Sequence, residues 1–194
     1  MYNQINADTL TKAGQFSLSD IQLISYISAE GGSNPKKISI RSQVLEINIY
    51  EDIFTKGLSG NVVVVDNQNV PNHLPLTGFE RIEFKLNTPG IAKGFDFTSV
   101  TGHPMYIYKI SARRELAPRT QMYVLNFASK EILTNETKKI YRSMTGTIDQ
   151  MVLDIFRRDI ESNKTLILEE TKGARKYVPT GLRPFEFIQS LGNS

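Results

Sequence analysis

Apolar and polar residues alternate with a period of two along much of the chain between residues 19 and 128. Such alternation is typical of strands with one buried and one wet face. Two segments show it most clearly, with inward residues Ile82, Phe84 and Leu86 in Arg81–Leu86, and Leu45, Ile47 and Ile49 in Val44–Tyr50. Val62–Val65 is apolar on both faces, so we expect it to be covered on both. The pattern predicts an antiparallel β structure.

Two later strands also lack a polar face. In the first, Tyr106 and Tyr108 oppose Met105 and Ile107, and in the second, Tyr123, Leu125 and Phe127 oppose Met122 and Val124. A second layer of the fold would cover the extra apolar face, and so would a neighbouring subunit. Under the second interpretation, we predict a subunit interface at Met105, Tyr106, Ile107, Tyr108, Met122, Tyr123 and Val124.

After residue 129 the apolar period changes to about 3.6, which indicates a second unit. Thr147 and Gln150 form a capping-box pattern ahead of an apolar stripe at Ile148, Met151, Val152, Ile155 and Phe156. We expect a strand at Lys164–Glu169 and a helix that begins at Pro184. The chain stops soon after that helix begins, which we interpret as missing C-terminal sequence.

Composition narrows the possible functions. The 194 residues contain no cysteine, which excludes disulfides and thiolate chemistry. Residues 1–97 carry 8 basic and 10 acidic groups, and residues 98–194 carry 15 and 10. The basic groups are scattered and form no block, so we predict no dedicated nucleic-acid binding. No apolar run is long enough to span a bilayer, and we predict no membrane association.

Candidate catalytic and metal-binding groups are sparse. His73 and His103 each lie in a proline-containing turn and lack the spacing of a zinc pair. Adjacent carboxylates at Glu51–Asp52 and Glu169–Glu170 point to opposite faces of a strand, so neither forms a ready dyad. Asp66–Asn69 offers oxygen ligands but lacks the glycine and glutamate of a calcium loop, so we interpret it as a turn. We predict no enzymatic activity, no metal and no cofactor.

Three stretches of the chain together resemble a known family. They are Leu45–Phe54 continuing through Gly60–Asp66, then Leu74–Phe84 ending at Thr88–Gly90, and finally Tyr177–Ile188. This order of strands and turns is similar to the N-terminal part of the baseplate central hub proteins of contractile-tailed bacteriophages. These proteins are related to the hub-like part of type VI secretion spike proteins.

The resemblance implies an α+β, mostly β fold: a tail-tube-like antiparallel β-barrel domain over residues 1–129, followed by a smaller α/β unit over residues 130–194. It further implies a structural virion protein, assembled in the host cytoplasm, whose copies form a trimeric ring on the tail axis. The ring's partners would be the tail tube and the spike. Family chains are usually longer, and a trimer with one tube-like domain per chain would not match a six-subunit tube ring.

Three other functions stay open. The chain could be another tail or baseplate component. It could also be a tail-tip cell-wall hydrolase, for which Glu51, Asp52 and Glu80 are the carboxylates to test. An oligonucleotide-binding barrel would use the aromatic residues and the basic C-terminal half, and would bind single strands in a salt-dependent way.

Overall fold

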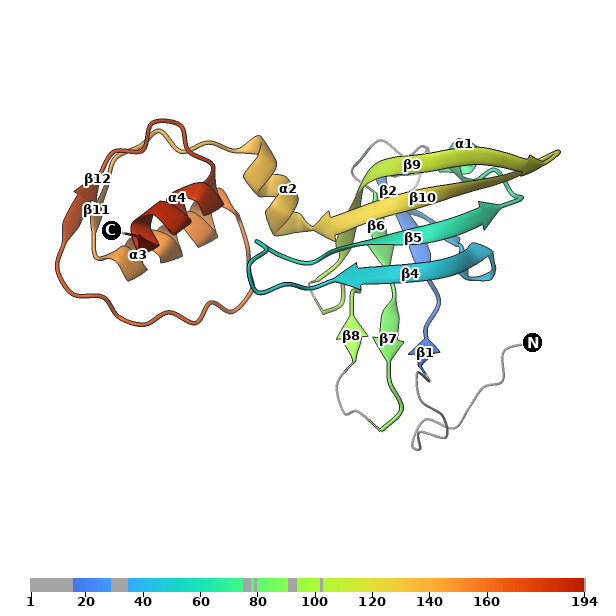
Figure 1. The fold of residues 1–194 in the computed structure, drawn as a ribbon, viewed down its shortest axis with the longest axis horizontal. Helices are drawn as coiled ribbons and strands as arrows, with labels where there is room; N and C mark the ends of the chain where they lie inside the picture. The colour runs from blue at the N-terminus through green and yellow to red at the C-terminus, as the bar shows by residue number, and fades with distance from the viewer. Residues whose placement is uncertain are drawn as a thin grey trace. The chain divides into compact units, whose positions relative to one another are not determined.

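Two compact units make up the computed structural model, which describes residues 16–28, 35–74, 78, 80–90, 94–101 and 103–193. The first unit takes the described part of residues 1–50 together with 59–128. The second takes Glu51–Leu58 and residues 129–194. Figure 1 shows strands in the first and most of the helices in the second.

A seven-stranded sheet dominates the first unit. Its strands run, in spatial order, β3 (Pro35–Ser39), β2 (Gln22–Ser28), β6 (Arg81–Glu83), β9 (Met105–Ala117), β10 (Thr120–Ser129), β5 (Ser59–Asp66) and β4 (Val44–Tyr50). Within the described residues, β3 and β4 pair with one neighbour each, so the sheet is open at both edges. The mostly β, α+β class is therefore confirmed, whereas closure into a barrel stays a prediction.

Three short strands form a second sheet, in the order β1 (Ser17–Leu18), β7 (Lys85–Asn87) and β8 (Phe95–Asp96). The predicted single strand Arg81–Leu86 is wrong in one respect, because it divides at Phe84 between the two sheets. The buried Phe84 ring lies 5.1 Å from that of Phe97 and 6.0 Å from that of Phe127, measured between ring centroids. The break therefore places this ring in an aromatic cluster of the core.

The remaining elements of the first unit are two short helical turns, η1 (Arg41–Gln43) and α1 (Val70–His73). The strand β4 that follows η1 also corrects the sequence prediction, which placed Leu45 inward. A β-bulge between Val44 and Glu46 shifts the register of β4 against β5, and Leu45 is 66% exposed. A bulge sets two residues against one, and it thereby interrupts the alternation that the prediction assumed.

The second unit contains α2 (Lys130–Thr137), α3 (Ile148–Asp154), which continues into the π-helical η2 (Ile155–Asp159), and α4 (Pro184–Gly192). A two-stranded sheet joins β11 (Met144–Gly146) to β12 (Arg175–Tyr177). The predicted helix starts at Thr147 and Pro184 are confirmed. The core of this unit consists of Ile140, Met144, Met151, Val152, Ile155, Ile160, Phe187 and Leu191.

The predicted strand at Lys164–Glu169 is wrong, because this segment has no strand partner and no regular structure. Its Ile167 is 92% exposed. The grouping of Glu51–Leu58 with the second unit was also not predicted. The backbone amide of Ser129 donates to the carbonyl of Leu58 at 2.9 Å, and a Cβ on Gly57 would lie 2.7 Å from Ser129 Oγ. A side chain at residue 57 would therefore displace the Ser129 hydroxyl and the side chain of Ile132, which favours a glycine there.

A buried carboxylate on α2 connects that helix to the segment that follows η2. Glu131 accepts hydrogen bonds from Ser162 Oγ at 2.8 Å and from Lys164 Nζ at 2.9 Å. Burial alone would raise the pKa of Glu131, but the bonds from Lys164 and Ser162 outweigh it and lower the pKa below 4.5. The ionised carboxylate is thus the form that the folded state favours.

We predict that the second unit loses stability in acid through Glu131. Because folding lowers this pKa, the contribution is present above pH 4.5 and is lost as the pH falls through the lower folded-state value. Glu131→Gln should cost about 2 kcal/mol at neutral pH and flatten the acid dependence. Urea unfolding from pH 3 to 7, followed by circular dichroism, measures both effects. The exposed Glu170→Gln is the control, and equal slopes in wild type and Glu131→Gln would contradict the prediction.

Candidate functional site

The residues predicted at a subunit interface divide into two sets according to the side of the sheet on which they lie. Those on the inner side are at most 2% exposed and belong to the core of this chain: Met105, Ile107 and Tyr123. Those on the other side are partly or largely exposed: Tyr106, Tyr108, Met122 and Val124. Tyr108 is the most exposed of them, at 49%. Only the second set is available to another molecule.

The pairing of β5 with β10 decides which side chains face outward. Opposite residues in an antiparallel pair share a face. Val65 lies opposite Met122 and Val63 opposite Val124, and all four are partly exposed. Val63 and Val65 therefore lack the full cover that we predicted for the second face of this strand.

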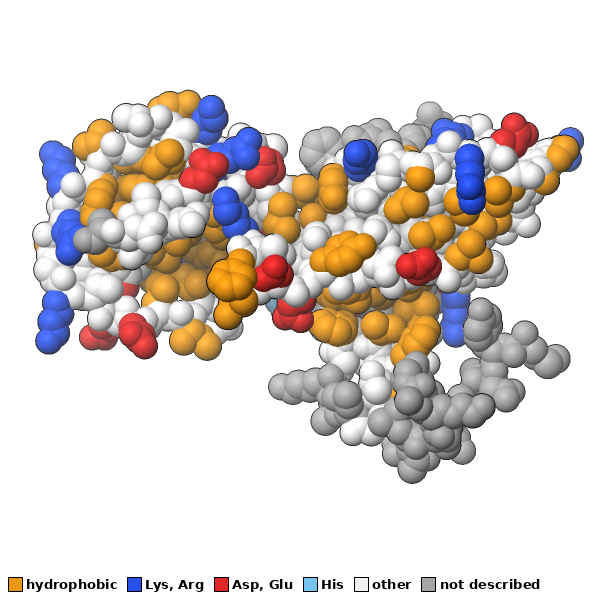
Figure 2. Space-filling model, viewed as in Figure 1, with side chains coloured by type: hydrophobic (Ala, Val, Ile, Leu, Met, Phe, Trp, Pro, Cys, Tyr) orange, Lys and Arg blue, Asp and Glu red, His pale blue; other side chains and the backbone are white. Residues whose placement is uncertain are grey.

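We refer to the outward residues Val63, Val65, Tyr106, Tyr108, Met122 and Val124 as the outer apolar face. Figure 2 shows hydrophobic side chains spread over β9, β10, β5 and β4 on the side turned toward the viewer. At the β4 edge, Leu45 is 66% exposed and Tyr50 is 53% exposed. An open edge strand with apolar neighbours is a surface on which another chain can dock.

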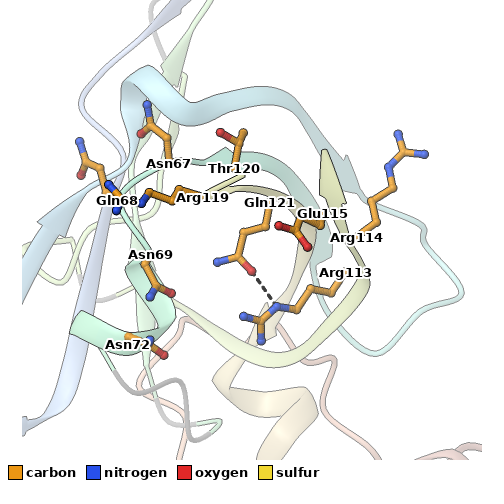
Figure 3. A pocket seen from close by; sticks show the side chains of 10 residues that line it. All are labelled: Asn67, Gln68, Asn69, Asn72, Arg113, Arg114, Glu115, Arg119, Thr120 and Gln121. Atoms are coloured by element: carbon orange, nitrogen blue, oxygen red, sulfur yellow. Dashed lines mark hydrogen bonds between the residues drawn. The ribbon is translucent and has the colours of Figure 1, made fainter. Parts of the chain in front are cut away.

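A second feature lies where β5 ends and the β9–β10 hairpin turns. There an open pocket of about 660 Å³ is lined by polar side chains from the loop after β5 and from the ends of both hairpin strands (Figure 3). Its charged lining residues are Arg113, Arg114, Arg119 and Glu115. The three arginines against one glutamate make the pocket basic.

Asp66 organises one wall of this pocket. Its side chain is fully buried and accepts hydrogen bonds from the backbone amides of Gln68 and Val70, each at 2.8 Å. It also accepts from Tyr123 Oη at 3.1 Å and from Gln121 Nε2 at 3.4 Å. Burial, followed by the neighbouring Asp66 carboxylate, raises the pKa of Tyr123 well above its usual range, so the phenol keeps its proton and donates.

Gln121 connects the hydrogen bonds of Asp66 to an arginine of the pocket. While its amide nitrogen donates to Asp66, its Oε1 accepts from Arg113 Nε at 2.8 Å. The guanidinium of Arg113 is thereby oriented through a chain of bonds that begins at a buried carboxylate. We predicted only a turn at Asp66–Asn69 and missed the site. The available signal was the gathering of Arg113, Arg114 and Arg119 around Pro118, but its link to Asp66 is not local in sequence.

The other candidate groups lie apart from this pocket. His73 ends the four-residue helix α1, a single helical turn that contains Pro71, and His103 is exposed. Glu51 and Asp52 are exposed, whereas Glu80 is buried and accepts from the backbone amide of Gly78 at 2.9 Å. In the described part of the chain, no three His, Asp or Glu side chains cluster so as to hold a metal ion. None of its helices is long and apolar enough to cross a membrane.

Comparison with known proteins finds a similar fold among the solved structures. No family model matches the sequence, and no curated protein matches it either. The fold, however, is similar to the crystal structure of the 43 kDa tail protein of prophage MuSo2 from Shewanella oneidensis, with a TM-score of 0.54 and 12% sequence identity. The match covers 90% of this chain and 47% of that protein, so this chain spans about half of its length.

We predict that Asp66→Asn destabilises the first unit by about 2–3 kcal/mol, because an amide cannot accept all the bonds that the buried carboxylate accepts. Tyr123→Phe should cost about 1 kcal/mol, since it removes one of them. Chemical denaturation of each variant measures these values. Glu46→Gln, at an exposed residue of the same unit, is the control and should differ little from wild type. A neutral Asp66→Asn would contradict the role given to Asp66.

Proposed function

We propose that this chain is a structural protein of a phage tail and that it acts as a subunit of the baseplate hub. The observation that carries the proposal is the fold it shares with a prophage tail protein over 90% of its length. In this role, copies of the chain form a ring on the tail axis that joins the tail tube to the spike. The protein is then a component of the virion and has no catalytic task.

The two open edges of the large sheet in the first unit support the formation of a ring. Its large sheet ends in β3 on one side and β4 on the other, and each is an open edge within the described residues. A contact between the β4 side of one copy and a different surface of the next is heterologous, and such contacts close into a ring when the rotation between copies allows it. We propose that the outer apolar face is covered in this assembly.

We propose that the ring contains three copies of the chain. The hub resemblance implies three copies, and three chains match a six-fold tube only where each contributes two tube-like domains. The prophage tail protein is about twice as long as this chain. A position elsewhere in the tail is the alternative function, because the structural similarity supports a tail protein without specifying its place.

We predict that the full chain assembles into closed rings and that Tyr106→Ser with Tyr108→Ser weakens this assembly. Removing two tyrosine rings that the assembly would bury costs about 3 kcal/mol of association free energy, or roughly a hundredfold in the dissociation constant. Sedimentation velocity over a range of concentrations measures the change, and electron microscopy shows whether the rings are closed.

The matched control is Tyr141→Ser, which removes a 70% exposed tyrosine from the second unit. It should assemble like wild type, and circular dichroism should show that both variants are folded. A wild-type chain that stays monomeric at its solubility limit contradicts the ring. A double variant that assembles as tightly as wild type removes the outer apolar face from the interface.

A further inference from the structure

The pocket at the β9–β10 turn contains an arginine whose hydrogen bonds are only partly used. Arg113 Nε is bound to Gln121 Oε1, whereas its two terminal nitrogens take part in no hydrogen bond or ion pair with the described residues. In Figure 3 the guanidinium points across the open space toward Asn69 and Asn72, at the start of α1 and within it, while Arg114 points away. Two parallel donors therefore face the pocket in a fixed orientation.

Backbone conformation singles out a second arginine. Arg119 has a φ of +66°, in the left-handed region, and Asn69 on the opposite wall has +57°. Asparagine tolerates this region, but for arginine it costs about 1–2 kcal/mol, which glycine would avoid. Strain of this kind concentrates at binding sites. Arg119 thus occupies a turn position where glycine would be more stable, and this indicates a binding role for its side chain.

We propose that this pocket binds a side-chain carboxylate of an acidic segment on a protein partner, with Arg113 as the bidentate donor. The planar fork of a guanidinium matches the two oxygens of a carboxylate. Arg119 adds positive charge, and the side-chain amides of Gln68, Asn69 and Asn72 provide donors and acceptors for the backbone of the bound segment.

The lining favours an acidic peptide over a nucleic acid. Single-stranded nucleic acids are held largely by stacking on aromatic rings, and no aromatic side chain is among the described residues that line the pocket. Glu115 also lies in the lining, and its negative charge disfavours a phosphate dianion more than a carboxylate monoanion. The two effects together favour a singly charged planar group.

The test titrates the full chain with a blocked peptide that contains Asp-Glu-Asp, at low salt, and records the Nε–Hε resonances of its arginines by NMR. The Arg113 resonance should shift on binding. Arg113→Gln should lower the affinity at least tenfold. Arg119→Gly should lower it severalfold while the chain becomes no less stable, because glycine relieves the strained turn.

Arg41→Gln is the matched control, since Arg41 is an exposed arginine of the same unit outside the pocket, and its affinity should equal that of wild type. Absence of a shift at millimolar peptide overturns the proposal. Equal binding of an uncharged control peptide, with Asn-Gln-Asn in place of Asp-Glu-Asp, also overturns it, and so does wild-type affinity in Arg113→Gln. If a single-stranded oligonucleotide binds more tightly than the peptide, the pocket is a nucleic-acid site. If inorganic phosphate shifts the Arg113 resonance as much as the peptide does, the pocket attracts anions in general and does not select a carboxylate. None of these results bears on the ring, whose proposed contacts use the outer apolar face, and that face shares no residue with the pocket lining.

Discussion

The antiparallel pairing of β5 with β10 is the constraint on which the rest of the first unit depends. It runs without a register shift from Asp66 opposite Gln121 to Ser59 opposite Ala128. A slip of one residue would exchange the two faces and turn Tyr123 and Leu125, both fully buried, toward solvent. This register therefore determines which residues form the core and which form the outer apolar face, and it sets Asp66 opposite Gln121 of the pocket. Gly60 permits it, because a Cβ there would lie 2.4 Å from Cζ of Phe127.

Polar contacts, besides an apolar core, connect the elements of the second unit. The buried residues of α2 are Glu131 and Asn135, so this helix is anchored by hydrogen bonds instead of an apolar stripe. Asn135 Oδ1 accepts from the backbone amide of Phe185 at 2.8 Å and satisfies a donor in the first turn of α4. Arg142 binds Asp154 and Asp159 at 2.6 Å each, which connects α3 and η2 to the segment before β11. The stability of this unit should therefore depend on the ionisation of its carboxylates more strongly than that of a unit held by apolar contacts alone.

Local patterns in the sequence predicted the elements that depend on local physics. The alternation in Tyr123–Phe127, the capping pair Thr147 and Gln150, and the proline at residue 184 are each confirmed. The errors arise where distant residues decide. The bulge at Leu45 depends on the register with β5, and the division at Phe84 depends on which sheet each half joins. Ile167 belongs to an apolar run that resembles a strand, yet the fold provides no partner for it.

The candidate sites were also harder to predict where they depend on residues that are distant in the sequence. Alternation separates Tyr106 and Tyr108 from Met105 and Ile107, but it does not say which pair faces the core, and the structure assigns that role to the second pair. The pocket could not be predicted at all, because the hydrogen bonds that orient Arg113 run through Gln121 to Asp66. Gln121 and Asp66 are 55 residues apart in the sequence.

The β9–β10 hairpin contributes both to the outer apolar face and to the pocket, and the two features differ in what they can supply to an assembly. Apolar contact is strong but weakly directional, so the outer apolar face alone would tolerate sliding between copies. A bidentate arginine–carboxylate contact requires a defined approach. If both proposals hold, the face supplies most of the affinity, and the pocket selects a partner and its orientation. That division explains why an arginine occupies a turn position where glycine would be more stable.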